Sequence, residues 1–262
     1  RSLGQNFLIN DRVIEKIILA VQQTKPASVI EVGPGLGALT RFLRNFQTDL
    51  SADLQLIELD RKLAEYWNHQ GIKVTEADAL QLNWAQLDFK KPSTLVSNLP
   101  YQISSSLLIE RSLDDIQLDN MILMFQKEVA QRIKADIRNE AYGMLSIVAQ
   151  TFWDIEFLLE ASPNDFYPAP KVASRVLVFH RKKNFIEKIS HSRKRHFFNF
   201  VKAAFVHPRK LMSSNLEEGF GIQKSEAQRI LTIHHLPEKA RPSQLKIDQF
   251  WEVYEAFFKV DQ

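Results

Sequence analysis

The feature of this sequence that most constrains its fold is a short apolar run that ends directly in a cluster of glycines. Residues 28–32 have the composition of a buried strand, and three of the chain's eight glycines follow within five residues, at Gly33, Gly35 and Gly37. A helix is predicted next, over about 38–46. Such a loop lets the backbone approach a ligand closely and presents amide groups at a helix N-terminus. The segment therefore predicts an α/β fold with a ligand site at this loop.

Strands and helices are predicted to alternate along the first two thirds of the chain. Further strands are expected at 54–58, 73–75, 93–97, 120–125, 155–159 and 174–180, and helices at 11–22 (capped by Asn10 or Asp11), 61–69, 104–113, 127–135 and 141–151. This alternation is typical of a mostly parallel sheet with helices on both faces. Four of the strands end near a polar residue, namely Glu31, Glu58, Asp78 and Asn98. The carboxyl ends of strands line the ligand crevice of open α/β sheets, so we expect these residues there.

The pattern changes after residue 182, where only helices are predicted: 187–206, 210–218, 225–235 (with Ser225 and Gln228 as a capping box) and 243–258. We expect two domains, an α/β domain over 1–183 and a small all-helical domain over 184–262. Residues 181–262 hold 16 Lys and Arg against 9 Asp and Glu, and within 181–215 the count is 10 against 1. This basic excess indicates either a polyanionic partner or a solvated helical surface.

Composition excludes several classes of function. The 262 residues include no cysteine, which excludes disulfides, iron–sulfur clusters and a cysteine nucleophile, and fits a cytoplasmic protein. The histidine pairs 191/196 and 234/235 have no acid at ligand spacing, so no metal is expected. No apolar run approaches the roughly 18–20 residues of a membrane helix, and no signal peptide opens the chain. Because the first residue is Arg1 and not Met, we expect a short leader before it.

The acids around the glycine loop discriminate between two cofactor classes. The loop can be aligned with the dinucleotide fingerprint, and Glu58, 21 residues beyond Gly37, is spaced as a ribose-binding acid. Glu31, however, precedes the first glycine where a dinucleotide-binding strand is normally apolar, and a carboxylate there suits a cationic cofactor such as S-adenosylmethionine. Asp78 is placed to accept a hydrogen bond from an adenine amino group. The structural alternatives are a helix cap for Asp78 and a lysine-paired acid for Glu31.

The turn at 98–101, Asn-Leu-Pro-Tyr, follows the fourth predicted strand beside this crevice. An exocyclic amine of a nucleobase is a poor nucleophile because its lone pair is delocalised into the ring. Hydrogen bonds from the amine to the Asn98 side-chain oxygen and the Leu99 carbonyl would direct that lone pair toward an incoming methyl group. Pro100 stiffens the turn, and Tyr101 offers a flat face for a base. The turn therefore favours methyl transfer to a base amine, assisted by positioning and electrostatics.

Taken in order, these segments resemble the ribosomal RNA adenine N6,N6-dimethyltransferases, and the small-subunit (16S) branch, the KsgA/RsmA family, most of all. The resemblance extends over nearly the whole chain and rests on residues 4–8, 31–40, 57–60, 78–79, 98–101, 126–129, 141–146, 166–172 and 241–245. It implies a Rossmann-like, seven-stranded S-adenosylmethionine-dependent methyltransferase fold with a helical C-terminal domain. It also implies dimethylation of two adjacent adenosines in a hairpin loop near the 3′ end of 16S rRNA, with a role in small-subunit biogenesis.

The resemblance implies a role for individual residues. The cofactor contacts would be Asn6, Leu8, Gly33, Gly35, Glu58, Asp78 and Asn98, with Asn6 and Leu8 folding over the cofactor. The catalytic turn would be Asn98, Leu99, Pro100 and Tyr101. Phe166 would stack on the other face of a flipped adenine, although a core aromatic is the competing interpretation. Phosphates of the rRNA would be held by Arg193, Lys194, Arg195, Lys202, Arg209 and Lys210, whereas the interleaved Phe197, Phe198, Phe200 and Phe205 read as core at helical spacing.

Three alternatives remain open at this point. One is a large-subunit rRNA adenine methyltransferase of the macrolide-resistance (Erm) type. Another is a ribosome-assembly factor that binds immature small subunits and for which methylation is secondary. The third, an NAD-dependent enzyme, is disfavoured by Glu31 and by the turn at 98–101. The expected partner is 16S rRNA or the immature small subunit, without a membrane or a metal, and the expected state is a monomer.

Overall fold

The computed structural model describes residues 6–49, 51–116, 118–183 and 189–258. Its contacts divide the chain into two compact units, one formed by residues 1–130 with 153–182 and the other by residues 131–152 with 183–262. The second unit therefore includes a helical segment, 131–152, that lies within the first domain expected from the sequence. The domain limits 1–183 and 184–262 stay a prediction, and each unit is described by itself.

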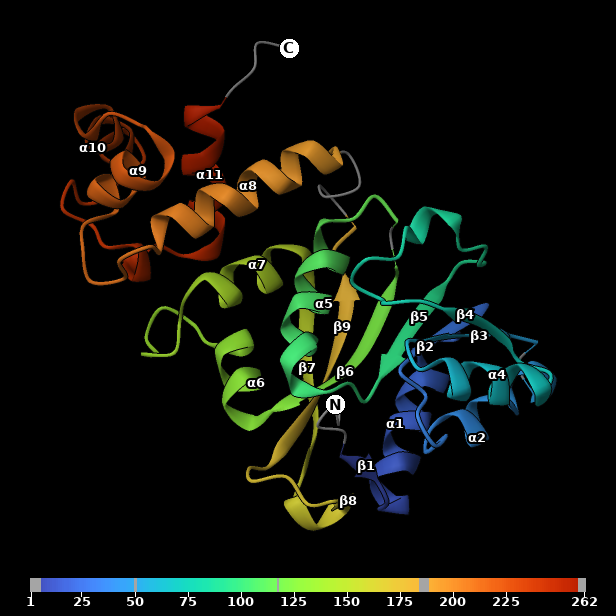
Figure 1. The fold of residues 1–262 in the computed structure, drawn as a ribbon. Helices are drawn as coiled ribbons and strands as arrows, with labels where there is room; N and C mark the ends of the chain where they lie inside the picture. The colour runs from blue at the N-terminus through green and yellow to red at the C-terminus, as the bar shows by residue number, and fades with distance from the viewer. Residues whose placement is uncertain (1–5, 50, 117, 184–188, 259–262) are drawn as a thin grey trace. The chain divides into compact units, whose positions relative to one another are not determined.

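A seven-stranded sheet forms the centre of the first unit (Figure 1). Its strand order is β4-β3-β2-β5-β6-β9-β7. The strands are β2 (Ser28–Val32), β3 (Asp53–Glu58), β4 (Lys73–Glu76), β5 (Ser93–Ser97), β6 (Asn120–Gln126), β7 (Trp153–Ala161) and β9 (Ser174–Arg181). The first five strands in this order pair in parallel, and β9 is antiparallel to both β6 and β7. This confirms the predicted mostly parallel sheet of an α/β methyltransferase-like fold.

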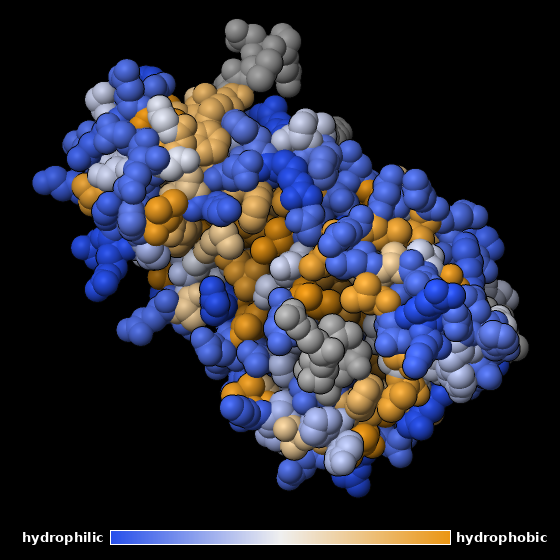
Figure 2. Space-filling model, viewed as in Figure 1, coloured by the Kyte–Doolittle hydropathy of each residue, from blue (hydrophilic) through white to orange (hydrophobic). Residues whose placement is uncertain are grey.

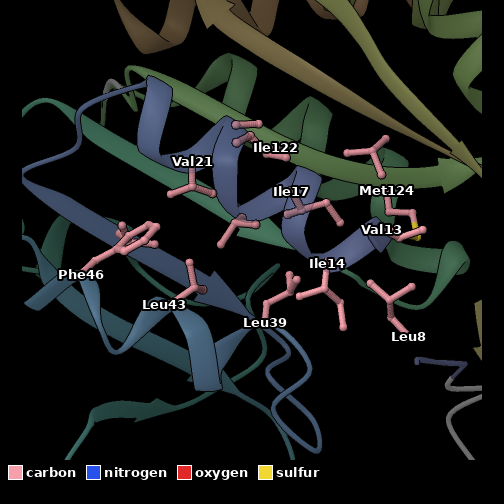
Figure 3. Close-up of a cluster of buried hydrophobic side chains, with 14 of the residues drawn as sticks. Leu8, Val13, Ile14, Ile17, Val21, Leu39, Leu43, Phe46, Ile122 and Met124 are labelled. Carbon is pink, nitrogen blue, oxygen red and sulfur yellow. The ribbon is translucent and has the colours of Figure 1, made fainter. Parts of the chain in front are cut away.

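One face of the sheet is covered by α1 (Asp11–Gln23), α2 (Thr40–Leu43) and α4 (Arg61–His69). The apolar face predicted for the first helix is buried, because Ile14, Ile17 and Val21 meet Ile122 and Met124 of β6 (Figure 3). The Asn10 side chain accepts a hydrogen bond from the backbone of Arg12 and caps α1, as predicted. This packing fixes the strand ends that carry the site.

The opposite face of the sheet is covered by α5 (Tyr101–Leu113). Successive strand residues point to opposite faces, so Phe125 of β6 lies on this second face and meets Phe179 of β9 edge to face, with ring centroids 6.0 Å apart. The Trp153 indole nitrogen donates to the Ser112 hydroxyl of α5 over 2.8 Å, which fastens the helix to the antiparallel strands. At its other end, α5 starts directly at the predicted catalytic turn, with Tyr101 as its first residue.

A separate two-stranded ribbon joins the start of the chain to a distant loop. It consists of β1 (Phe7–Leu8) and β8 (Phe166–Tyr167), which lie side by side at the lower edge of Figure 1. A 3₁₀ turn, Pro163–Asp165, leads into β8. This pairing is not predicted from the sequence.

Helices build the second unit: α7 (Met144–Phe152), α8 (His191–Ala204), α9 (Met212–Phe220), α10 (Lys224–Ile233) and α11 (Ile247–Phe257); α6 (Lys127–Lys134) straddles the division between the units. Phe197 and Phe200 are fully buried and contact the Tyr254 ring of α11, which confirms their predicted core role. The Tyr142 hydroxyl donates to the Leu245 carbonyl over 2.8 Å, so 131–152 is tied to the C-terminal helices. Hydrophilic residues cover most of the surface over α9 and α10 (Figure 2).

Three local predictions are wrong. The helix expected over 38–46 begins only at Thr40, because Gly35 and Gly37 adopt positive φ and residues 35–39 form turns. A turn at residues 44–45 then separates α2 from α3 (Phe46–Asp49). The capping box of Ser225 and Gln228 is absent, because α10 begins at Lys224 and its N-cap is Gln223, without a side-chain hydrogen bond. The last helix begins at Ile247 and not at Ser243, after a 3₁₀ turn at Pro242–Gln244.

Candidate active site

A pocket of about 300 Å³ lies at the carboxyl ends of β2 and β5. Its walls are residues 6–9 of the N-terminal segment, residues 33–39 of the glycine loop with Glu31 and Arg41, and the turn at 98–101. Three segments that are distant in the sequence therefore meet at one site. The site lies where open α/β sheets bind their ligands.

The glycine loop is shaped by backbone geometry and by Trp67. Gly33, Gly35 and Gly37 have φ values of +66°, +52° and +86°, a region that side chains rarely adopt. A Cβ atom on Gly37 would lie 2.4 Å from the Trp67 ring, whose indole nitrogen donates to the Gly35 carbonyl over 3.0 Å. The loop is thus held against α4, and its backbone is left to line the pocket.

Glu58 supports this loop from the end of β3. Its carboxylate accepts hydrogen bonds from the Gly35 amide over 3.3 Å and from the Asp60 amide over 2.9 Å. The side chain is buried and is not part of the pocket wall. In this structure Glu58 therefore acts on the loop, and its predicted contact with a cofactor stays a prediction.

Glu31 is the buried acid of the pocket. Its carboxylate accepts a hydrogen bond from the Thr40 hydroxyl over 2.7 Å, so this hydroxyl, and not the lysine of the structural alternative, is its hydrogen-bond partner. Burial, together with the nearby charge of Glu58, raises the pKa of Glu31 to about 8, although the Thr40 hydrogen bond opposes this shift. A positive charge in the pocket would favour the ionised carboxylate.

The turn at 98–101 closes the pocket opposite the glycine loop. The Ser97 hydroxyl donates to the Val32 carbonyl over 2.5 Å, which joins the ends of β5 and β2. The Asn98 amide nitrogen donates to the Asn6 carbonyl over 3.4 Å, and Pro100 is the N-cap of α5. The half-buried Tyr101 hydroxyl lies 2.6 Å from the Ser174 hydroxyl, and burial raises the pKa of Tyr101.

The N-terminal segment is anchored where it passes the pocket. Leu8 pairs with Phe166 in the ribbon, and the Ile9 amide donates to the Asp165 carbonyl over 2.9 Å. The Asn10 amide nitrogen also donates to the Asp165 carboxylate over 2.5 Å. Asn6 and Leu8 are thereby placed in the pocket wall, as expected if they fold over a cofactor.

Two further predicted residues lie outside the pocket wall. The Asp78 carboxylate accepts a hydrogen bond from the Leu80 amide over 2.9 Å in a turn at residues 79–81, so Asp78 does not form the helix cap of the structural alternative. Phe166 is 3% exposed and belongs to the core cluster beside Leu8. Conversely, Phe7, Ile9, Leu36 and Arg41 line the pocket and were missed. Phe7 lies within segment 4–8 and Leu36 within segment 31–40, so the family resemblance was the available signal for these two residues.

Comparison with known proteins decides the family. The family model of ribosomal RNA adenine dimethylase matches residues 1–259 of this chain. The chain belongs to the ribosomal RNA adenine dimethylase family. The enzyme is an S-adenosyl-L-methionine-dependent rRNA adenine dimethyltransferase, which excludes the nicotinamide alternative for the glycine loop.

Named relatives agree with this assignment, and two solved structures share the fold. The enzyme is 48% identical to ribosomal RNA small subunit methyltransferase A of Bdellovibrio bacteriovorus over 98% of this chain and 92% of the relative. It is 39% identical to the protein of the same name from Desulfitobacterium hafniense, over 99% and 92%. A dimethyladenosine transferase from Plasmodium falciparum superposes with a TM-score of 0.72 at 22% identity over 97% and 98% of the two chains. The 23S rRNA methyltransferase ErmE gives 0.65 at 22% identity over 98% and 100%, which shows the shared fold.

The pocket fits the methyl donor of this family. S-adenosylmethionine carries an ammonium and a sulfonium and has no phosphate, and the buried acid of the pocket is the carboxylate of Glu31. Gly33 and Gly35 leave the space that side chains would fill, since a Cβ there would lie 3.2 Å from Leu99 and 3.5 Å from the Phe7 ring. The Glu31 carboxylate therefore matches the positive charge of the donor, and the glycine backbone allows the donor to approach closely.

The basic residues predicted to hold rRNA differ in their surroundings. Lys202, Arg209 and Lys210 are exposed, and Lys210 pairs with Glu218 over 3.0 Å. Arg193 pairs with Glu255 over 2.5 Å, and the Nε of the partly buried Arg195 lies 3.5 Å from a His191 ring nitrogen. Lys194 is fully buried, so its predicted phosphate contact is wrong in this structure, because a buried ammonium does not reach RNA. Lys202 and Arg209 stay the strongest candidates.

Neither a metal-ion site nor a membrane-spanning helix is found in the described part of the chain. There, no three His, Asp or Glu side chains gather in a way that would hold a metal ion. In the same residues, no helix combines the length and the apolar content that crossing a bilayer requires.

Proposed function

We propose that this enzyme dimethylates N6 of two adjacent adenosines in a hairpin loop near the 3′ end of 16S rRNA, as part of small-subunit biogenesis. The support is the nearly full-length match, at 48% and 39% identity, to relatives whose names specify the small subunit. The likeness to a 23S enzyme, at 22% identity, concerns the fold alone. The small-subunit target is therefore favoured over the Erm-type alternative.

The observation that carries the catalytic proposal is the orientation of the Asn98 amide. Its nitrogen donates to the Asn6 carbonyl, which leaves the side-chain oxygen to accept a hydrogen bond from an adenine amine in the pocket. The Leu99 carbonyl accepts the second amine hydrogen. Together these two acceptors orient the amine so that its lone pair points toward the methyl group. They contribute to catalysis by positioning and by electrostatics.

The bound donor supplies an electrophilic methyl group on a sulfonium. We propose that Glu31 faces its positively charged end, that Asn6, Leu8, Gly33 and Gly35 enclose it, and that Glu58 and Asp78 meet its ribose and adenine. No strong general base is required in the pocket, because the methylated, positively charged amine loses its proton readily. The contribution of these residues is binding, orientation and exclusion of water.

Stacking would hold the target base flat in front of Asn98. Tyr101 lines the pocket and is the aromatic residue of the catalytic turn. For Phe166, the proposed contact with the other face of the base requires its ring to leave the core cluster, because the side chain is 3% exposed. Base flipping of this kind is least costly for a nucleotide in a loop.

The proposal is tested by methylation of purified ribosomal subunits. The enzyme and radiolabelled S-adenosylmethionine are incubated with small and with large subunits that lack adenine methylation, and the rRNA is digested to nucleosides. We expect label in N6,N6-dimethyladenosine from the small subunit alone. Label in the large subunit alone would favour the Erm-type alternative and contradict the proposal.

The assembly-factor alternative calls for a separate measurement. A variant that has lost methyl transfer is mixed with immature small subunits, and binding is followed by sedimentation. Binding without methyl transfer would indicate that the enzyme both methylates rRNA and acts as an assembly factor. We propose that it does so as a cytoplasmic monomer.

A further inference from the structure

The ribbon of β1 and β8 has two different faces. In an antiparallel pair, directly opposite residues lie on the same face, and successive residues alternate between faces. Leu8 lies opposite Phe166, and Phe7 lies opposite Tyr167. The ribbon therefore presents one pair to each side.

The first pair faces the core. Leu8 and Phe166 are 4% and 3% exposed and belong to the same hydrophobic cluster. Burial of both side chains fixes the register of the ribbon, because a shift by one residue would exchange its faces. The position of the opposite face is therefore well defined.

The second pair faces the pocket side. Phe7 lines the donor pocket, as do Leu8 and Ile9, but Leu8 is buried, whereas Ile9, two residues beyond Phe7 on the same face, is exposed. Tyr167, opposite Phe7, is 72% exposed, while Ile9 is 57% exposed. Leu36 of the glycine loop also lines the pocket and is 71% exposed. An exposed aromatic ring thus extends an apolar rim that is continuous with the active site.

We propose that Tyr167 stacks on the base next to the target adenosine and so helps to select the RNA strand that enters the pocket. The inference rests on the proposed function, in which two adjacent adenosines are modified. When one adenosine is in the pocket, the neighbouring base remains at the rim, where an exposed aromatic face is the group that binds unpaired bases. The rim favours a nucleobase as its occupant, because a base has a flat apolar face and because the active site beside the rim takes RNA.

The test compares the kinetics of three variants on undermethylated small subunits with saturating radiolabelled S-adenosylmethionine. Tyr167→Ala removes the ring, and Tyr167→Phe keeps it. Phe157→Ala is the matched control, because Phe157 is another exposed aromatic residue but lies on β7, the sheet edge remote from β2 and β5. Binding of the demethylated donor product to each variant is measured by calorimetry.

We expect Tyr167→Ala to raise KM for the subunit about 5- to 150-fold with little change in kcat, the loss associated with one stacked base. Tyr167→Phe and Phe157→Ala should stay within two-fold of the wild type, and product affinity should be unchanged in all three. An unchanged KM in Tyr167→Ala, an equal loss in Tyr167→Phe, or a parallel loss of product affinity would overturn the inference.

Failure of the proposed function would look different. It would appear as a wild-type enzyme that methylates the large subunit and not the small one. The same three variants would then be compared on the large subunit, and the same ratios would decide the role of Tyr167 there.

Discussion

Asn98 is the residue whose chemistry the account depends on most. Its amide nitrogen makes one long hydrogen bond, to the Asn6 carbonyl, and its side chain is half-buried in the pocket wall. We predict that Asn98→Ala lowers kcat at least about 100-fold, the scale on which one oriented polar group contributes to a transition state. The free energy of unfolding should fall by only about 1 kcal/mol or less, since one weak hydrogen bond is lost.

The matched control for this variant is Asn83→Ala. Asn83 is exposed and caps a 3₁₀ turn by accepting a hydrogen bond from the Ala85 amide. Its loss should reduce stability slightly and leave methyl transfer intact. Methyl incorporation and urea unfolding, measured on both variants, check the prediction. Full activity in Asn98→Ala would remove this residue from the mechanism.

Glu31 makes the stability of the donor-free enzyme depend on pH. Its pKa is about 8 in the folded chain against 4.5 for a free side chain, so the folded state binds more protons between these values. Stability therefore falls as pH rises from 4.5 to 8, by at most about 1.4 kcal/mol per pH unit. Urea unfolding at several pH values should reveal this slope for the wild type.

Glu31→Gln provides the comparison, because it keeps the shape of the side chain and cannot titrate. Relative to the wild type, the variant should gain stability as pH rises toward 8. Arg41 and Glu58, the neighbouring charged groups, are unchanged in the variant. The difference between the two pH curves therefore reports the titration of Glu31. Parallel pH curves for the two proteins would mean that Glu31 is ionised in the folded state throughout this range.

At the scale of elements, the glycine loop is packed against α4 and depends on it for its position. We predict that Gly37→Ala destabilises the enzyme by about 1–3 kcal/mol more than Gly71→Ala, the cost of overpacking. Both glycines have positive φ, at +86° and +78°, but a Cβ on Gly37 would meet the Trp67 ring whereas one on Gly71 would meet nothing within 4 Å. The control thus isolates backbone strain from the clash.

The clash should also reach the donor. Trp67 holds the Gly35 carbonyl, so displacing its ring shifts the loop that lines the pocket. Calorimetry should show donor affinity at least about ten-fold weaker for Gly37→Ala than for Gly71→Ala. Equal stabilities and affinities of the two variants would show that Trp67 does not hold the loop.

Strands and their polar ends could be predicted from the sequence because both depend on short local patterns. Residues 28–32 and 93–97 are runs of strand length that contain β-branched residues, and each leads into its functional residues directly. The pairing of Phe7 with Tyr167 could not be predicted, because it joins residues 160 positions apart over only two residues. The late start of α2 was also missed, since it follows from backbone dihedrals at Gly35 and Gly37 and not from hydrophobic spacing.

At the scale of the whole molecule, the distribution of charge predicts how RNA binding responds to salt. Lys202 and Arg209 are exposed, and in the described residues neither forms an ion pair with an acidic side chain. We predict that Lys202→Ala and Arg209→Ala each reduce the slope of log affinity against log salt by about 0.7–0.9, one released counterion per lost phosphate contact.

Lys16→Ala is the control for this measurement, because Lys16 is an exposed lysine on α1 of the first unit. It should leave the salt slope unchanged. Filter binding of small-subunit rRNA at several salt concentrations gives the three slopes. Unchanged slopes in both Lys202→Ala and Arg209→Ala would contradict the assignment of these two residues to RNA phosphates.

Charge counts located the basic segment but could not say which of its cations face solvent. Burial of Lys194 depends on how α8 packs, which the count of Lys and Arg does not contain. Likewise, the helices predicted over 127–135 and 141–151 fit the α/β pattern of the first domain, yet the contacts of residues 131–152 place this segment with the C-terminal helices. Tertiary contacts, and not local sequence, decide both cases.

The measurement that tests the account most directly is a crystal structure with S-adenosylhomocysteine, the demethylated donor product. We predict that the amino-acid end lies between Glu31 and the glycine loop, that the adenine lies beside Asp78, and that the sulfur faces the Asn98 side chain. A ligand bound elsewhere, or one whose adenine lies far from Asp78 and whose sulfur faces away from Asn98, would contradict the account.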